Sequence, residues 1–337
     1  MKKRMLAMTL AGVMAAGVLA GCGGSGGSSS NGSGSGNAAA SGGDYKIDVI
    51  LKTTASEYWS YVKAGAEAYG KDNNVNVEVK GATSETAYDE QQNMIETDLN
   101  SGAYDAFVIA PLQADLAANL ISGQEAPIIA VDTNIDAPEI KSFVGTGNVD
   151  AAAMGGEAAV KAAKDAGWKE INAIAISGVQ GDGTATDRLT GYQKGVEKAG
   201  GKFLDKEVQY ADAVADKAVN SMEAIMQNHP EGVAIICCNN DDMAMAAARA
   251  AKDNKAYKDT IFVGFDGIQS ACKAILDGEE TMSVAQEAYD MGYKAVDAAV
   301  KSLNGEELDS FIDSGCSVID ASNAQERLDT LKGYIGE

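Results

Sequence analysis

The chain has 337 residues, a formal net charge of −22 from 49 acidic and 27 basic side chains, and a single histidine. Such an acidic surface repels polyanions, which excludes nucleic acid and anionic lipid surfaces as electrostatic partners. The length is large for one hydrophobic core and suits two medium-sized domains.

Residues 1–21 have the layout of a secretory signal peptide: Lys2, Lys3 and Arg4, then an apolar run, then small residues. The apolar run is shorter than the roughly 20 residues that a membrane-spanning helix needs, so a retained span is the weaker alternative. The sequence "LAGC", which ends at Cys22, resembles the lipobox of bacterial lipoproteins. This resemblance implies cleavage before Cys22 and attachment of lipid to its sulfur.

Residues 22–43 are expected to form a lipidated cysteine followed by a linker. After Cys22 the segment is almost entirely Gly, Ser, Asn and Ala, a composition that favours a flexible chain over a folded one. We therefore expect an extracytoplasmic domain, anchored by lipid to the outer face of the cytoplasmic membrane.

From residue 44 onward, short apolar runs alternate with longer amphipathic stretches. This alternation predicts βαβ units and parallel sheets that are covered on both faces, which is the α/β class. The stretch "VGTGNV" at 144–149 is a seam where a second sheet is expected to begin. Strands are predicted at 46–51, 75–79, 106–110, 127–131, 171–176, 202–209, 233–238, 261–263 and 281–285, and helices at 58–69, 86–100, 151–166, 189–199, 217–228 and 242–252.

Four cysteines lie in the part that is predicted to fold: Cys237, Cys238, Cys272 and Cys316. Their spacing is not that of a disulfide framework or of a metal site. The first two end an apolar run, so we interpret them as small buried apolar residues.

Ligands of open α/β sheets bind beyond the carboxyl ends of the strands, so the loops there are the candidate site. After the first predicted strand, a polar loop with Lys52 and Ser56 leads into the aromatic pair Tyr58 and Trp59. An aromatic face suits the C–H face of a sugar ring, although simple packing at a helix start is the alternative.

Carboxylate and amide side chains follow three further strands: Asp132 in "IIAVDTN", Asn240 in "IICCNNDD" and Asp266 in "VGFDG". Together with Arg188 in "ATDRLTGY", these groups accept and donate hydrogen bonds as a polyol requires. Asp and Asn are also common helix N-caps, and capping is the first interpretation for the two aspartates that follow Asn240.

From about residue 45 to residue 320, the chain resembles the ribose-binding-protein-like substrate-binding proteins of bacterial ABC sugar importers. The motifs that carry the resemblance are "NHPEGVAIICCNNDDMAMAAARA", "VGFDG", "VAQ" and "RLTGYQKGV", with looser matches at "APIIAVDTN" and "KTTASEYW". The resemblance implies the type I periplasmic-binding-protein fold, in which two Rossmann-like lobes joined by a three-segment hinge close around one sugar.

The resemblance also implies which residues contact the ligand. The aromatic pair and Asp132 would contact the sugar from the first lobe, with Gln286 near a hinge crossing. Two positions depart from the pattern of ribose binders. Those proteins have an arginine at the position of Thr133 and an aromatic residue near the positions of Ala213 or Val214. These departures argue against ribose as the ligand. The full implied set of ligand-binding residues is Lys52, Ser56, Tyr58, Trp59, Asp132, Arg188, Asn240, Asp266 and Gln286.

Crossings between lobes are implied near 146–148, 286 and 314–316. Lobe 1 would then comprise residues 44–147 and 287–315, and lobe 2 residues 148–286 and 316–337. Three linking segments permit a hinge motion and resist twisting.

Enzymatic alternatives have weak support in the sequence. "GVQGDGTAT" at 178–186 lacks the third glycine of a dinucleotide-binding loop, and "DTNIDAPE" lacks the glycine and glutamate of a calcium loop. His229, beside Pro230, is expected in a surface turn at a helix end. We therefore expect no catalytic residues, no metal and no cofactor.

The expected function is that of a monomeric extracytoplasmic solute-binding protein, which presents a monosaccharide or related polyol to an ABC importer. One alternative is a sensory protein that presents the sugar to a chemoreceptor or a histidine kinase. A secreted carbohydrate-active enzyme is a further alternative from a different class.

Overall fold

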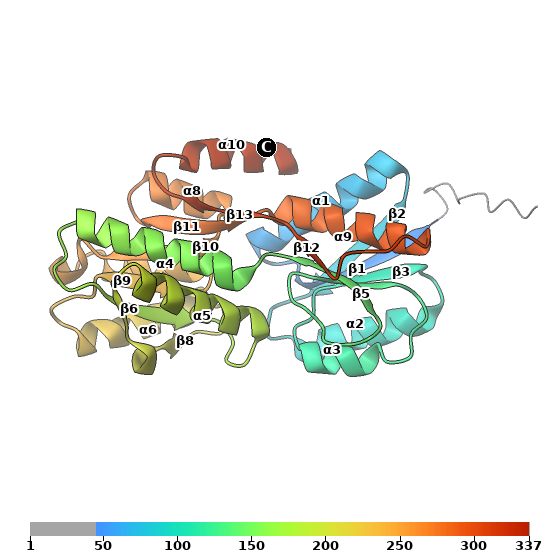
Figure 1. Cartoon of the computed structure of the whole chain (residues 1–337), viewed down its shortest axis with the longest axis horizontal. Helices are drawn as coiled ribbons and strands as arrows, with labels where there is room; N and C mark the ends of the chain where they lie inside the picture. The colour runs from blue at the N-terminus through green and yellow to red at the C-terminus, as the bar shows by residue number, and fades with distance from the viewer. Residues whose placement is uncertain (1–44, 337) are drawn as a thin grey trace, which may run out of the picture. The chain divides into compact units, whose positions relative to one another are not determined.

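The computed structural model describes residues 45–336 (Figure 1). The predicted signal peptide, the lipidation site Cys22 and the linker lie outside the described residues. Two β-sheets organise the described part of the chain.

The first sheet has six parallel strands in the order β12-β5-β4-β3-β1-β2. Helices α1 (Glu57–Asn73) and α9 (Ala288–Leu303) pack on one face, and α2 (Tyr88–Ser101) and α3 (Ala114–Leu120) on the other. We call this sheet and its helices lobe 1. Its strands are β1 (Lys46–Thr53), β2 (Asn76–Ala82), β3 (Ala106–Ile109), β4 (Ile128–Val131), β5 (Ile140–Gly145) and β12 (Phe311–Asp313).

The second sheet follows the order β13-β11-β10-β9-β6-β7, with β8 also paired to β6; only β13 runs antiparallel to its neighbour. We call this sheet and its helices lobe 2. Its strands are β6 (Asn172–Ser177), β7 (Lys202–Phe203), β8 (Gln209–Tyr210), β9 (Ile235–Cys238), β10 (Ile261–Asp266), β11 (Met282–Gln286) and β13 (Cys316–Ile319). Its helices are α4 (Asn148–Asp165), α5 (Gly183–Lys198), α6 (Ala215–Asn228), α7 (Asp241–Ala251), α8 (Gln269–Leu276) and α10 (Ala324–Ile335).

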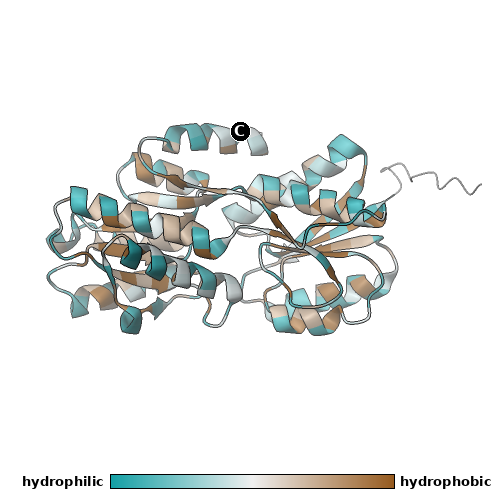
Figure 2. Ribbon diagram, viewed as in Figure 1, coloured by the Kyte–Doolittle hydropathy of each residue, from teal (hydrophilic) through white to brown (hydrophobic). Residues whose placement is uncertain are grey.

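Successive strand residues point to opposite faces, so a strand that is covered on both sides carries apolar residues on both faces. In β1, Val49 belongs to the core under α1 and α9, whereas Ile50 belongs to the core under α2 and α3. Figure 2 shows the result as hydrophobic strands inside and hydrophilic outer faces on the helices. The predicted α/β class with two parallel-sheet lobes is confirmed.

The chain passes between the two sheets at three places that lie side by side. It leaves lobe 1 after β5, returns after β11, and leaves again between β12 and β13. The hydroxyls of Thr146 and Ser314 are 3.1 Å apart, and the amide of Glu287 donates to the carbonyl of Gly315. The first and third of these crossings are thus linked directly by a hydrogen bond.

Glycine allows two pairs of helices to approach closely. A Cβ atom at Gly292 of α9 would overlap the carbonyl oxygen of Val62 in α1, and one at Gly195 of α5 would overlap the carbonyl oxygen of Ala153 in α4. The many small residues of the sequence therefore serve close helix-on-helix packing as well as helix-on-sheet packing.

Several predicted boundaries need correction. The single strand expected at 202–209 is two short strands, β7 and β8, separated by a 3-10 turn at Asp205–Glu207. The short strand expected within 144–149 lies earlier, at β5, and residue 148 already begins α4. Helix α5 begins six residues before the predicted start, because the Asp182 side chain caps it by accepting from the amide of Ala185. Elements α3, α8, α9, α10, β12 and β13 were not predicted.

The cysteines behave as expected from their position. Cys237 and Cys238 are fully buried in β9, and all four cysteines of the described chain are free thiols. Burial raises the pKa of the Cys237 thiol, which makes it a poor nucleophile at neutral pH. His229 ends α6 as its C-cap, with its ring against Glu207.

Candidate ligand-binding site

A cavity of about 50 Å³ lies between the two lobes. One water needs roughly 10–15 Å³ on this measure, so the space exceeds a single solvent site. Lobe 1 contributes the end of β1, the start of α1 and the loops after β2, β3 and β4. Lobe 2 contributes the loops after β6, β8 and β9, the start of α5 and the end of β10. The lining residues are Lys52, Tyr58, Trp59, Glu85, Leu112, Asp132, Val179, Asp182, Thr184, Ala185, Arg188, Ala213, Asn239, Asn240 and Asp266.

The parallel sheets explain why residues so distant in sequence meet here. Asp132 follows β4 directly, Asn239 and Asn240 follow β9, and Asp266 ends β10. The carboxyl ends of parallel strands share one edge of a sheet, and the two lobes turn these edges toward each other. Asp132 has φ 63° and Asp266 has φ 118°, so both turn away from the strand in backbone conformations that are uncommon for residues other than glycine.

The aromatic pair forms one wall of the cavity. The rings of Tyr58 and Trp59 meet edge to face, with centroids 5.1 Å apart and an angle of 81°. Tyr58 donates from its hydroxyl to Asp132 at 3.0 Å, and Trp59 donates from its indole nitrogen to Glu85 at 3.0 Å. Both side chains are buried in lobe 1 and also line the cavity. They therefore pack at the start of α1 and can also contact a ligand.

Lys52 joins carboxylates from both lobes. Its ammonium lies 3.5 Å from a carboxylate oxygen of Asp132 in lobe 1 and 3.7 Å from one of Asp182 in lobe 2. Burial lowers the pKa of Lys52, but attraction by Asp132, Asp182 and Glu85 outweighs burial and raises the pKa overall. The lysine therefore stays charged at neutral pH.

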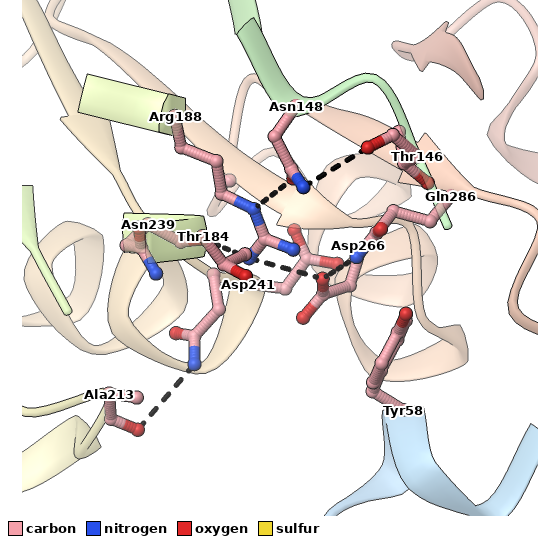
Figure 3. Close-up of polar contacts among 12 residues, drawn as sticks. Tyr58, Thr146, Asn148, Thr184, Arg188, Ala213, Asn239, Asp241, Asp266 and Gln286 are labelled. Carbon is pink, nitrogen blue, oxygen red and sulfur yellow. Dashed lines mark hydrogen bonds and ion pairs between the residues drawn. The ribbon is translucent and has the colours of Figure 1, made fainter. Parts of the chain in front are cut away.

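Arg188 is the main donor of lobe 2. Its guanidinium donates to the side-chain oxygen of Asn148 at 2.8 Å (Figure 3) and to the backbone oxygen of Asn239 at 2.9 Å, and it lies over the ring of Phe265. Its Nη1 lies 3.7 Å from Asp266. These contacts hold a planar cation rigidly at the cavity wall.

Asp266 faces Tyr58 across the cavity (Figure 3). Burial raises its pKa well above the usual range, although the Arg188 cation and a hydrogen bond from Gln286 oppose the rise. The Gln286 side-chain amide donates to Asp266 at 2.7 Å and does not line the cavity. Its place is behind the carboxyl group, which it orients.

Of the nine residues predicted for the site, the structure brings seven to this cavity: Lys52, Tyr58, Trp59, Asp132, Arg188, Asn240 and Asp266. Ser56 is not among them. It occupies the N-cap position of α1, partly exposed, and its side chain makes no capping hydrogen bond. Gln286 does not line the cavity and lies behind Asp266.

The capping interpretation is wrong in detail. The residue that caps α7 is Asn240, whose side-chain oxygen accepts from the amide of Met243. Asp241 is instead fully buried and accepts from the Ser283 hydroxyl and from the backbone amide of Ile268. Asn240 thus has a structural role besides its position at the cavity.

Several lining residues were not predicted from the sequence, notably Glu85, Asp182 and Thr184, whereas Asn239 lies in the predicted loop "IICCNNDD" but was not assigned to the ligand. Asp182 lies at the end of the loop between β6 and α5, whereas Asp132 was identified because it directly follows its strand. Glu85 lies in a loop without periodicity, so nothing in its neighbourhood marked it.

Of the two positions that depart from ribose binders, Ala213 lines this cavity, whereas Thr133 does not line it but contacts Asp132, which does. Ala213 has a small side chain and φ 59°. Thr133 is buried and donates its hydroxyl hydrogen to Asp132 at 2.9 Å, and its oxygen lies 2.8 Å from the hydroxyl of Thr184 in lobe 2. Since Thr133 uses its one hydrogen for Asp132, Thr184 is the donor between the two hydroxyls.

Comparison with models of known protein families identifies the family of this chain. Residues 47–307 match the model of the periplasmic binding protein domain, which is more than half of the chain. The chain belongs to the periplasmic binding protein family. Its resemblance to ribose-binding proteins is thereby confirmed at the level of the family and the fold.

Named relatives share this length and fold. The chain is 25% identical over 272 residues to the ribose import binding protein of Bacillus subtilis, covering 80% of this chain and 85% of that protein. It is 30% identical over 258 residues to the D-allose-binding periplasmic protein of Escherichia coli, covering 72% and 80%. A carbohydrate transporter solute-binding protein from Agrobacterium radiobacter, solved with D-arabinose, superposes with a TM-score of 0.77 at 27% identity, covering 85% and 98%.

These relatives are binding proteins for sugar import, which supports a binding role over an enzymatic one. The family's extracytoplasmic location agrees with the export signal expected from the sequence. Within residues 45–336, no helix is both long enough and apolar enough to cross a membrane.

Proposed function

We propose that this protein is the extracytoplasmic solute-binding component of an ABC importer and binds a neutral monosaccharide between its lobes. The observation that carries the proposal is the convergence of Tyr58, Trp59 and Asp132 of lobe 1 with Arg188 and Asp266 of lobe 2 on one cavity. Aromatic faces next to carboxylates and a guanidinium fork suit a ring that is apolar on its faces and hydroxylated at its edge.

The charges of the lining favour a neutral ligand. Four carboxyl groups line the cavity against two cations, and both cations already lie beside carboxylates within the protein. A sugar phosphate or a uronic acid would bring a further negative charge into this surplus, whereas hydroxyls donate to it. The side-chain oxygen of Asn239 is buried and has no hydrogen-bond partner among the described residues, so it offers one more acceptor.

Binding is coupled to closure in this proposal. The two lobes contribute separate parts of the lining, so a sugar contacts all of them only when the lobes are closed. The permease of the importer would then recognise the closed form. The lobes proposed here are those expected from the sequence, residues 44–147 with 287–315 and residues 148–286 with 316–337, and the strand order of the two sheets supports them.

A thermal-shift screen of pentoses, hexoses, inositols and their phosphates, followed by calorimetry, tests the ligand class. The proposal expects a rise in melting temperature with one or a few neutral sugars and none with the corresponding phosphates. Recovery of every sugar unaltered after incubation separates a receptor from an enzyme. A response to phosphorylated sugars alone would contradict the proposed class.

Anchoring by lipid is a separate part of the proposal, supported by the lipobox-like "LAGC" at Cys22. Mass spectrometry of the mature N-terminus should find a diacylglyceryl group on Cys22. Cys22→Ala should release the protein from the membrane fraction, whereas Cys316→Ala, a matched control in the folded part, should leave it there.

A sensory role is a second candidate, because a site of this kind serves a chemoreceptor or a histidine kinase equally well. Co-purification with a permease or with a sensor ectodomain in the presence of the sugar distinguishes the two roles.

A further inference from the structure

A second and larger cavity of about 370 Å³ adjoins the first between the lobes. It shares Asp132 and Thr184 with the first cavity. Its volume lies within the range of roughly 300–1,000 Å³ that is usual for pockets that bind small molecules. The rest of its lining comes from α3, the loop after β4, β5, the start of α4, the start of α5 and β12.

The partition between the two cavities is thin. Thr133 and Thr184 meet there, one from each lobe, with their hydroxyl oxygens 2.8 Å apart. Each hydroxyl rotates freely about one bond, and the Thr184 hydroxyl is a donor. A glycosidic oxygen accepts hydrogen bonds and donates none, so a linkage that passes from one cavity to the other would accept from Thr184 after its hydroxyl hydrogen turns from Thr133 to the linkage.

Aromatic residues form the outer wall of the second cavity. Phe143 of β5 and Phe311 of β12 are register partners on adjacent strands, and their ring centroids are 5.4 Å apart at an angle of 30°. Phe311 is 41% exposed, an unusual position for a large apolar side chain. An exposed ring beside a cavity is a suitable platform for the C–H face of a sugar.

Polar groups also line the second cavity. Asp150 and Asp187 of lobe 2 are exposed carboxylates in the lining, and Asn134 of lobe 1 adds an amide. Asn148, also in the lining, accepts from Arg188, so the polar groups of the two cavities are hydrogen-bonded to each other. The lining of the second cavity thus combines aromatic rings with groups that accept from hydroxyls, as the lining of the first cavity does.

We propose that the second cavity is a subsite for a second sugar ring, so that the protein binds a disaccharide with one ring in each cavity. This inference rests on the proposed sugar-binding function. The first ring lies between Tyr58 and Asp266, the glycosidic oxygen accepts from Thr184, and the second ring stacks on Phe311.

Calorimetry with the wild-type protein is the first arm of the test. It uses each monosaccharide that raises the melting temperature, the disaccharides that contain it, and its phenyl glycosides. At least one disaccharide is expected to bind tenfold or more tightly than its monosaccharide. A gain with phenyl glycosides and none with disaccharides would overturn the assignment to a second sugar.

Variants of the aromatic platform are the second arm. Phe311→Ala should abolish the disaccharide gain and leave monosaccharide affinity within twofold, whereas Phe311→Tyr should retain the gain. Tyr210→Ala removes an aromatic residue of similar exposure, 43%, from β8 of lobe 2 and serves as the matched control. Circular dichroism and melting temperatures show whether each variant folds, and Phe311→Leu replaces the alanine variant if that one does not.

The outcomes separate the two proposals. If monosaccharides bind and no disaccharide binds more tightly, or if the gain survives in the Phe311 variant that folds, the second subsite is wrong and the first site stands. If no sugar of either size binds, the proposed function itself fails.

Discussion

Replacing Asp266 by asparagine tests the polar half of the site without changing its shape. Asparagine keeps an oxygen that accepts from Gln286, and it tolerates the φ of 118° at this position better than alanine does. In its ionised form, which Arg188 at 3.7 Å favours, Asp266 accepts with both carboxylate oxygens, whereas asparagine replaces one acceptor with a donor. A sugar hydroxyl that donates to a carboxylate therefore loses its partner.

The expected loss follows from the kind of bond removed. Hydrogen bonds to charged groups contribute about 1.5–3 kcal/mol, which corresponds to a roughly 10- to 150-fold rise in Kd. Isothermal titration calorimetry with the sugar found by thermal shift measures this rise. Asp253→Asn, which neutralises an exposed carboxylate of lobe 2, is the control and should leave Kd unchanged. An unaltered Kd for Asp266→Asn, in a variant with a cooperative melting transition, would refute the role of Asp266.

Three further predictions concern the stability of the protein and its affinity for the sugar. Burial raises the pKa of Glu280 well above its usual range and that of neighbouring Asp241 to about 7, so the folded state holds protons that the unfolded state releases. The free energy of unfolding, measured by urea titration, should therefore fall as pH rises from the ordinary carboxyl range through about 7. This fall should be smaller in Glu280→Gln than in the wild-type protein. Identical pH profiles for the two proteins would contradict the prediction. Gly292→Ala should lower stability by about 1–3 kcal/mol because its Cβ overlaps the carbonyl of Val62, and an unchanged melting temperature would contradict that close packing. Lys52→Met removes the ammonium between the carboxylates of the two lobes and should weaken sugar binding at least tenfold in calorimetry, whereas equal affinity would show that the lysine is dispensable.

Apolar continuity made most of the strands predictable. The run that forms β9 is apolar throughout because both faces of that strand are covered, and its sequence shows this directly. Residues 202–209 contain apolar positions too, but a 3-10 turn interrupts them, and the pattern carries no sign of that turn. Helix α5 began earlier than predicted because its first turn is set by the Asp182 cap and not by apolar periodicity.

The candidate site was predictable where a polar residue directly follows a strand. Asp132 and Asp266 carry that signal, and the sequence order of the strands fixes the edge at which they lie. The sequence pattern does not predict which residues of one lobe contact residues of the other. The contact of Asp182 with Lys52 joins residues from different sheets, and only the arrangement of the lobes reveals it. The role of Gln286 was likewise not predictable from the sequence. We expected it to contact the ligand, but its side-chain amide donates to Asp266.

The crystal structure of the protein with its sugar tests the central claim most directly. The account predicts one sugar ring between the lobes, in contact with Trp59 and Asp132 from lobe 1 and with Arg188 and Asp266 from lobe 2. A sugar bound to one lobe alone, or at a surface outside this cavity, would contradict it.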